Sequence, residues 1–427
     1  MNMAVNPQFA INDFEFSRGI YDGRGVYLNG CGNTNGNACG NFPSTYPGTY
    51  RINSSCNPCN SDPLYNPSLR GPSAIPGPTI PGTTPNPLVN PFGPRRMVTT
   101  WKINYLVAPR LNHAAHLDIE LVNSWGIVVY NNQLWVANGT TDKITNYDLF
   151  GNKLLGAITV RDAAHNSSFP TGLVVNCGNG FSVTNGSISR TATLLTATEH
   201  GTLHAYNPAV DPLNAYIVIN QQITGEVSVF KGLALANNIV YLANFFQMRI
   251  DVFNSDYVRL LGFNFIDGDT FDPIPLDFGP NNIVYIGCYL YVLWAKRDPN
   301  VPIHGLHSVG LGFVSVFNLD GSFVRRFASR GVLNSPWAMI PAPPDCGFPS
   351  CSFLIGNNGD GRINAFDSNG RYLGPLLDQE GKPVAIEGLW GLAPHYTSFS
   401  EIFYASAADE DTDGLVGSLV KDQSIFF

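Results

Sequence analysis

Three aspartates near the end of the chain have the spacing of a cation-binding loop. Asp409, Asp411 and Asp413 alternate with other residues, and Gly414 follows them. The first half of an EF-hand calcium loop has this pattern, because alternate carboxylates converge there and the glycine permits a sharp turn. The bidentate glutamate expected at the twelfth position is replaced by Val420, and the flanking residues lack helical spacing. A true EF-hand is therefore excluded, which leaves a partial Ca²⁺ site or a solvated acidic turn.

The cysteines permit metal or redox chemistry without defining it. Four of them lie in the first sixty residues: Cys31, Cys39, Cys56 and Cys59. The last two have the CxxC spacing of a zinc or redox pair, but the first two are too far apart to complete a zinc ribbon. Zinc, disulfides and thiols therefore all remain open for this group. Cys346 and Cys351 enclose a loop that is short enough for a disulfide to close.

Nucleophilic catalysis receives little support from the sequence. The chain has no Gly-x-Ser-x-Gly elbow, which is the signature of one large class of serine hydrolases. Its histidines are scattered, and the pairs His113/His116 and His304/His307 lie in segments without helical spacing. We interpret them as surface residues of turns. No catalytic residue is assigned, and the sequence favours a protein that is not an enzyme.

The elements that must position these residues are short strands. The segment 121–155, LVNSWGIVVYNNQLWVANGTTDKITNYDLFGNKLL, alternates runs rich in Val, Ile, Tyr and Trp with Asn-Asn, Asn-Gly and Gly-Asn pairs. The runs favour a half-buried pleated surface, and the pairs supply the positive φ angles of tight hairpins. The segment predicts an antiparallel meander, which needs similar neighbours to bury both faces.

The meander recurs about every fifty residues, which indicates a propeller or solenoid. First strands align as Trp125-Gly-Ile, Thr171-Gly-Leu, Lys231-Gly-Leu, Asn282-Ile-Val, Trp337-Ala-Met and Trp390-Gly-Leu. Six such units fill the region from Trp101 to Leu419, and helical spacing is nearly absent. The sequence therefore predicts an all-β fold, a six-bladed β-propeller with four-stranded blades over residues 99–427. A closed ring leaves no open edge, so we expect a strand at Trp101–Val107 to complete the blade that begins at Leu389.

Three longer motifs resemble a known family. They are Ala114-Ala-His-Leu-Asp-Ile-Glu-Leu-Val-Asn-Ser-Trp-Gly-Ile127, Gly356-Asn-Asn-Gly-Asp-Gly-Arg-Ile-Asn-Ala-Phe-Asp367 and Ile386-Glu-Gly-Leu-Trp-Gly-Leu392. They resemble motifs of uncharacterised six-bladed, NHL-repeat-like β-propellers that occur in bacteria and giant DNA viruses. The resemblance covers roughly residues 103–420. The chain departs from the family pattern at two places. The family has Pro where this chain has Ser124, and it has an acidic pair followed by His-Gly where this chain reads Asp409-Glu-Asp-Thr-Asp-Gly414. Such membership implies a fold and no particular activity.

The turns that follow the second strands of a propeller gather at one mouth of its central channel. We therefore expect polar side chains there from several blades: Asn138, Glu199, Asn244, Lys296, Asn357, Asp360 and Asp409. Oxygen ligands from several blades could hold a hard cation such as Ca²⁺. The alternative is that these side chains only form the hydrogen bonds of their own turns.

Residues 1–98 have a different composition and form the predicted N-terminal arm. The arm is rich in Gly, Pro, Asn and Cys, and Pro recurs every few residues between Pro63 and Pro94, which favours extended backbone. Its first half contains Phe9, Phe14 and several other aromatic residues that could dock on a partner. Disorder is the alternative interpretation.

Charge and hydropathy restrict the possible partners. The net charge of −8, with 13% charged residues, disfavours nucleic-acid binding, which requires basic patches. No apolar run is long enough for a membrane span, and the first residues lack the features of a secretory signal.

Two functional hypotheses follow from these features. The first is a structural or interaction propeller, part of a virion or other surface assembly, whose arm binds protein partners or other copies of the chain. The second is a lactonase-like propeller hydrolase with a metal in the channel. The expected location is a virion or extracellular surface assembly, and the alternative is the cytoplasm.

Overall fold

A computed structural model describes residues 97–161, 167–344, 346–395 and 400–426 of the chain. Most of the predicted arm lies outside these residues, as do Cys31, Cys39, Cys56 and Cys59. The described part begins with β1 at Met97, two residues before the predicted boundary between arm and propeller. Its only helices are the short 3₁₀ helix η1 (Gln222–Thr224) and the short helix α1 (Ala408–Asp411).

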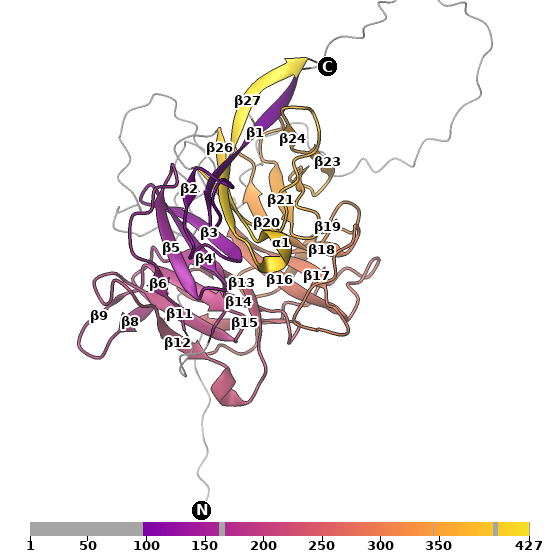
Figure 1. The fold of residues 1–427 in the computed structure, drawn as a ribbon. Helices are drawn as coiled ribbons and strands as arrows, with labels where there is room; N and C mark the ends of the chain where they lie inside the picture. The colour runs from indigo at the N-terminus through magenta and orange to yellow at the C-terminus, as the bar shows by residue number, and fades with distance from the viewer. Residues whose placement is uncertain (1–96, 162–166, 345, 396–399, 427) are drawn as a thin grey trace, which may run out of the picture.

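The strands form six antiparallel meanders (Figure 1). Blade 1 comprises β3 (Ser124–Tyr130), β4 (Gln133–Asn138), β5 (Lys143–Asp148) and β6 (Ile158–Thr159). Blade 2 comprises β7 (Pro170–Val175), β10 (Leu194–Thr198), β11 (Thr202–Tyr206) and β12 (Tyr216–Asn220), and carries the inserted hairpin β8 (Ser182–Thr184) and β9 (Ser189–Thr191). Blade 3 comprises β13 (Phe230–Ala236), β14 (Ile239–Asn244) and β15 (Arg249–Asn254).

Three further blades follow in the same pattern. Blade 4 comprises β16 (Phe278–Ile286), β17 (Tyr289–Lys296), β18 (Gly312–Phe317) and β19 (Phe323–Ser329). Blade 5 comprises β20 (Pro336–Pro341), β21 (Phe353–Asn357), β22 (Ile363–Phe366) and β23 (Tyr372–Pro375). Blade 6 comprises β25 (Leu389–Pro394), β26 (Glu401–Ser406), β27 (Leu415–Phe426) and β1 (Met97–Ala108), with the short strands β2 (His116–Leu117) and β24 (Leu377–Asp378) beside β1.

The innermost strands close into a ring. They make contacts in the cyclic order β3, β7, β13, β16, β20, β25 and back to β3. The prediction of an all-β, six-bladed propeller is therefore confirmed. Blade 3 departs slightly from it, because its fourth position is a bridge from Phe253 to Arg259 rather than a regular strand.

The predicted turn chemistry also holds. Asn131 and Asn132 connect β3 to β4 with φ angles of 51° and 57°, and Asn237 and Asn238 connect β13 to β14 with 49° and 57°. Asparagine tolerates this left-handed region better than most residues, and two such residues in succession match the twist of a hairpin.

Every innermost strand carries a β-bulge at the same level, where one extra residue interrupts its pairing with the second strand. The residues that follow the bulge are small in five of the six blades: Gly126, Gly172, Gly232, Ala338 and Gly391. A Cβ atom added to Gly126 would lie 2.6 Å from the backbone nitrogen of Leu173, so the neighbouring inner strands touch here. Blade 4 has Asn282 at this level, so the alignment of Asn282 with Trp125 was wrong by one residue, and Asn281 is the true equivalent.

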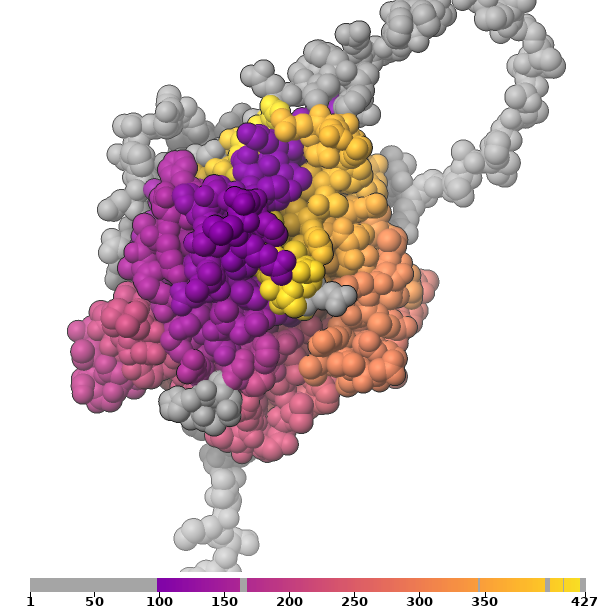
Figure 2. All heavy atoms as spheres, viewed as in Figure 1, coloured from indigo at the N-terminus to yellow at the C-terminus, as the bar shows by residue number. Residues whose placement is uncertain are grey.

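The ring is closed by the two ends of the described chain. β1 pairs antiparallel with β27, from Met97 opposite Phe426 to Val107 opposite Val416. Figure 2 shows the indigo first strand in contact with the yellow last strands on the molecular surface. The predicted closure by Trp101–Val107 is confirmed, and Trp101 itself is buried.

We expect this closure to decide where the chain can be shortened. Removal of residues 1–95 leaves β1 intact and should leave a cooperatively folded propeller. Removal of residues 1–110 deletes β1, exposes the edge of β27 and should lower the melting temperature or abolish the transition. Circular dichroism melts of both chains test this. Equal melting temperatures for the two would contradict the role of β1.

Candidate ligand-binding cavity at the channel mouth

The bulges direct one residue of each inner strand toward the axis. The six residues at this position are Trp125, Thr171, Lys231, Asn281, Trp337 and Trp390. A bulge re-aims the side chain of its extra residue, and the side chains of Trp125, Trp390 and Lys231 lie against one another.

Three of these residues form an indole cluster. The rings of Trp125 and Trp390 are stacked with centroids 3.4 Å apart, and Trp337 meets both edge-on at 6.4 and 5.8 Å. All three tryptophans are buried in one hydrophobic cluster shared by blades 1, 5 and 6. The indole cluster therefore joins the inner strands of blades 1, 5 and 6.

A cavity of about 1010 Å³ opens above this cluster at one mouth of the channel. Trp125 and Trp390 form part of its floor. Its walls include residues 225–229, from the connection between blades 2 and 3, and residues 303–305, from the connection between β17 and β18 of blade 4. Ligand pockets commonly have volumes of about 300–1,000 Å³, so this cavity could take up a molecule of that class.

Lys231 is the charged group at the floor of the cavity. Its side chain is only 4% exposed, and its Nζ atom lies 4.6 Å from the centroid of the Phe245 ring, 5.2 Å from that of Trp125 and 5.7 Å from that of Trp390. Burial lowers the pKa of the Lys231 ammonium, against the opposing effect of the Glu199 and Asp411 carboxylates. The electron-rich ring faces also favour the charged form, so the group is held among apolar walls but remains a strong donor.

Glu199, Asp411 and His307 surround this lysine. Glu199 Oε1 lies 3.7 Å from Lys231 Nζ, which is within ion-pair range but longer than an ordinary hydrogen bond. Burial raises the pKa of Asp411, although Lys231, His304 and His307 oppose the rise. Burial and then the charge of Lys231 lower the pKa of His307. Lys231 therefore lies between two acidic side chains and a histidine with a reduced tendency to carry charge.

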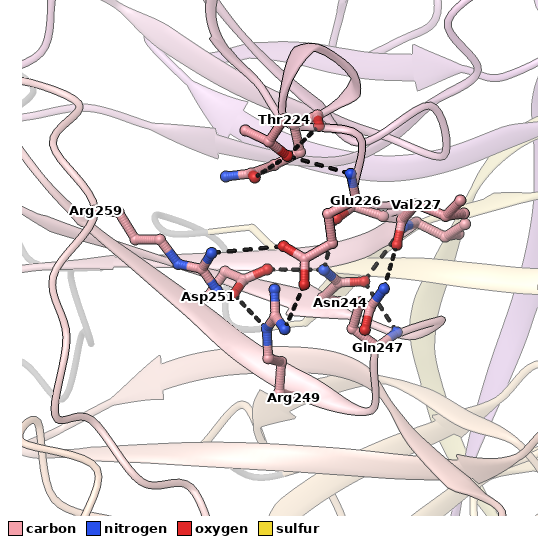
Figure 3. Close-up of polar contacts among 11 residues, drawn as sticks. Thr224, Glu226, Val227, Asn244, Gln247, Arg249, Asp251 and Arg259 are labelled. Atoms are coloured by element: carbon pink, nitrogen blue, oxygen red, sulfur yellow. Dashed lines mark hydrogen bonds and ion pairs between the residues drawn. The ribbon is translucent and has the colours of Figure 1, made fainter.

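One wall of the cavity is fixed by an ion-pair network between blades 2 and 3 (Figure 3). The carboxylate of Glu226 lies 2.7 Å from Arg249 and 3.6 Å from Arg259. Both arginines also bind the buried Asp251, which accepts a hydrogen bond of 2.7 Å from Asn244 Nδ2. The hydrogen bond from Arg249 lowers the pKa of Glu226. The loop that carries Glu226 is thus anchored to blade 3.

The asparagines predicted at the channel mouth are buried structural residues. Asn138 receives a hydrogen bond from Ser124 and donates to Thr145, and Asn244 joins the network just described. Asn357 donates to Val332 O and to Asp360, whose carboxylate also accepts a bond from a backbone amide. Only Glu199 of the predicted mouth residues lines the cavity together with Lys231, while Asn138, Asn244, Lys296, Asn357, Asp360 and Asp409 do not.

The three alternating aspartates have different environments. Asp409 pairs with Arg110 at 3.0 Å, and Asp413 pairs with the same arginine at 3.2 Å. Asp411 instead lines the cavity. Among the described residues, no three His, Cys, Asp or Glu side chains are grouped so that they could hold a metal ion. The Ca²⁺ site therefore gains no support from this geometry and stays a prediction.

The predicted Cys346–Cys351 disulfide gains no support from the structure and stays a prediction. The side chain of Cys346 is buried in the hydrophobic cluster that contains Trp337 and Trp390. The predictions for the cysteines of the arm concern residues outside the described part of the chain.

Sequence reasoning missed Lys231 and the histidines of this cavity. His304 and His307 were interpreted as surface residues of a turn, whereas both line the cavity. The signal for Lys231 was present, because it precedes a glycine at the same strand position as Trp125 and Trp390. A bulge could not be inferred from that position alone, so the direction of the side chain was not predicted.

The strand order, the closed ring and the axial cavity define the protein as a six-bladed β-propeller. No protein-family model matches the chain. It belongs to one family with uncharacterised protein R648 of Acanthamoeba polyphaga mimivirus, which is 61% identical over 370 residues, 87% of this chain and 90% of the relative. Uncharacterised protein L690 of the same virus is 64% identical over 341 residues, 80% of this chain and 91% of the relative.

A solved structure of a protein of unknown function from Bacteroides thetaiotaomicron is also similar. It has a TM-score of 0.49 and 11% sequence identity, and the match covers 76% of each chain. The expected resemblance to proteins of giant DNA viruses is confirmed by the two mimivirus relatives. Occurrence of the family in bacteria stays a prediction.

Trp390→Ala should destabilise the protein strongly, because it removes a ring that is stacked on Trp125 and faces Lys231. Truncation of a buried tryptophan costs about 3–5 kcal/mol. The measurement is a denaturant titration followed by circular dichroism. Tyr372→Ala, which truncates a partly exposed aromatic residue of blade 5, should have a much smaller effect. Equal stabilities of Trp390→Ala and the wild type would show that the indole cluster does not hold the ring together.

Proposed function

We propose that this protein is an interaction module, a rigid propeller that is displayed on a virus particle or a comparable surface assembly. One support for this proposal is that the chain belongs to the same family as two mimivirus proteins. The closed ring also suits a displayed body, because β1 pairs with β27 and so covers the outer edge that β27 would otherwise leave open. In this proposal residues 1–98 attach the propeller to protein partners or to other copies of the chain. The protein is then located in the virus particle or on an extracellular surface, and not in the cytoplasm.

The observation that carries the proposal is an apolar connection between blades 3 and 4. Leu261, Phe271 and Leu276 lie between β15 and β16 and are 86%, 99% and 93% exposed. Single exposed apolar residues are ordinary, and contiguous apolar patches mark interaction sites; we propose that these three residues contribute to such a patch. Asp267 of the same connection pairs with Arg326 at 2.7 Å, so part of the connection is fixed to blade 4.

A second feature supports attachment near the chain ends. Figure 1 shows β1 and β27 projecting together beyond the rest of blade 6, and Met97 pairs with Phe426 near the end of this ribbon. The arm therefore joins the propeller at a projecting ribbon and not at the cavity. A partner could hold the arm while the cavity remains accessible.

The alternative of a metal-dependent hydrolase has less support. No group of metal ligands is formed within the described residues, and the cavity is lined instead by a lysine, aromatic rings and separated carboxylates.

None of the helices in the described part of the chain has the length and apolar character needed to cross a bilayer.

Light scattering on the full chain and on residues 97–427 tests the proposal. The full chain should associate, because a Pro-rich segment has little conformational entropy to lose on binding. The shortened chain should be folded and monomeric or should associate much more weakly. Phe271→Ser in the full chain should reduce association further, whereas Tyr372→Ser should not. Monomeric masses for both chain lengths, in the presence and absence of reductant, would contradict the assembly role.

A further inference from the structure

The cavity at the channel mouth contains polar groups that the protein itself leaves incompletely satisfied. The side chain of Lys231 is only 4% exposed, and this residue lines the cavity. Among the described residues its nearest acidic oxygen is Glu199 Oε1 at 3.7 Å, too far for a normal hydrogen bond. A buried ammonium with unused donors is costly unless another molecule supplies acceptors.

The acidic side chains of the cavity differ in whether another protein group already binds them. Glu226 is held by Arg249 at 2.7 Å, and Glu387 accepts a hydrogen bond of 3.2 Å from the backbone amide of Asp409. Glu199 and Asp411 have no comparably short side-chain contact among the described residues, and both act electrostatically on Lys231. Among the charged groups of the cavity, those least engaged by the protein are therefore one donor, Lys231, and two acceptors, Glu199 and Asp411.

This arrangement discriminates by charge. An anionic molecule that reached the buried Lys231 would also meet the carboxylates of Glu199 and Asp411, and like charges repel. A cationic molecule that reached these carboxylates would meet the Lys231 ammonium. A neutral molecule with adjacent hydroxyl groups avoids both penalties, because each hydroxyl can accept a hydrogen bond and donate one.

We propose that the channel-mouth cavity binds a neutral saccharide. One hydroxyl oxygen accepts a hydrogen bond from Lys231 Nζ, while a neighbouring hydroxyl donates to Glu199 or to Asp411. Trp125 and Trp390 form an apolar floor beneath this polar group. The cavity of about 1010 Å³ is large enough for a short oligosaccharide as well as a single ring. This proposal concerns a different part of the molecule from the assembly surface and does not depend on it.

Binding to the full chain is measured by saturation-transfer NMR and calorimetry. The panel contains glucose, galactose, mannose, N-acetylglucosamine and their disaccharides, with glucosamine as the cationic analogue and glucuronate as the anionic analogue. At least one neutral saccharide should bind, and its charged analogues should bind at least fivefold more weakly. Lys231→Met, which retains the apolar stem, should weaken binding at least tenfold.

Asp411→Asn and Glu199→Gln keep the test valid if Lys231→Met does not fold. Both should weaken binding severalfold, because an amide is a poorer acceptor for a hydroxyl than a carboxylate. Lys382→Met, at an exposed lysine between β24 and β25, should bind like the wild type, and melting temperatures of all variants show that they are folded. The proposal is overturned if no neutral saccharide binds, if a charged analogue binds better than its neutral parent, or if Asp411→Asn and Glu199→Gln both bind like the wild type.

Discussion

The close approach of six inner strands around one axis is the constraint on which the rest of this structure depends. A Cβ atom at Gly391 would lie 2.5 Å from the carbonyl oxygen of Trp125, and one at Gly172 would lie 2.6 Å from a methyl group of Leu233. Only small residues permit this approach in five blades. Blade 4 has larger residues at this level. The side chains of Asn281 and Asn282 donate hydrogen bonds to the backbone of the neighbouring inner strand β20, at 3.0 and 2.7 Å.

The same constraint produces the cavity floor. The bulge beside each small residue turns the preceding side chain toward the axis, and these side chains then pack on one another rather than on a blade face. The indoles of Trp125 and Trp390, from blades 1 and 6, therefore lie against the amine of Lys231 from blade 3. A propeller with no bulges at this level would bury the same residues between blades and would lack a charged group at the bottom of its channel.

Much of the fold could be predicted because it depends on local patterns. The Asn-Asn turns, the recurrence of Trp-Gly at the inner strands and the strand at Trp101–Val107 all follow from short-range chemistry or from the need to close a ring. The position of Asn281 could not be predicted, because blade 4 has no glycine to mark its bulge. The environment of Asp411 could not be predicted either, because Asp409 and Asp411 both adopt positive φ angles, of 54° and 64°, which the sequence pattern does not indicate.

The central claim is that axial packing of the inner strands holds the ring together, and Gly391→Ala tests it most directly. The added methyl group would overlap Trp125 O and Ile127, and overpacking of this kind costs about 1–3 kcal/mol. Gly156→Ala is the matched control, because its methyl group would meet only the side chain of Leu213 at 3.3 Å. The measurement is the free energy of unfolding from denaturant titrations followed by tryptophan fluorescence. The account predicts a clear loss for Gly391→Ala and little change for Gly156→Ala, and equal stabilities of the two variants would contradict it.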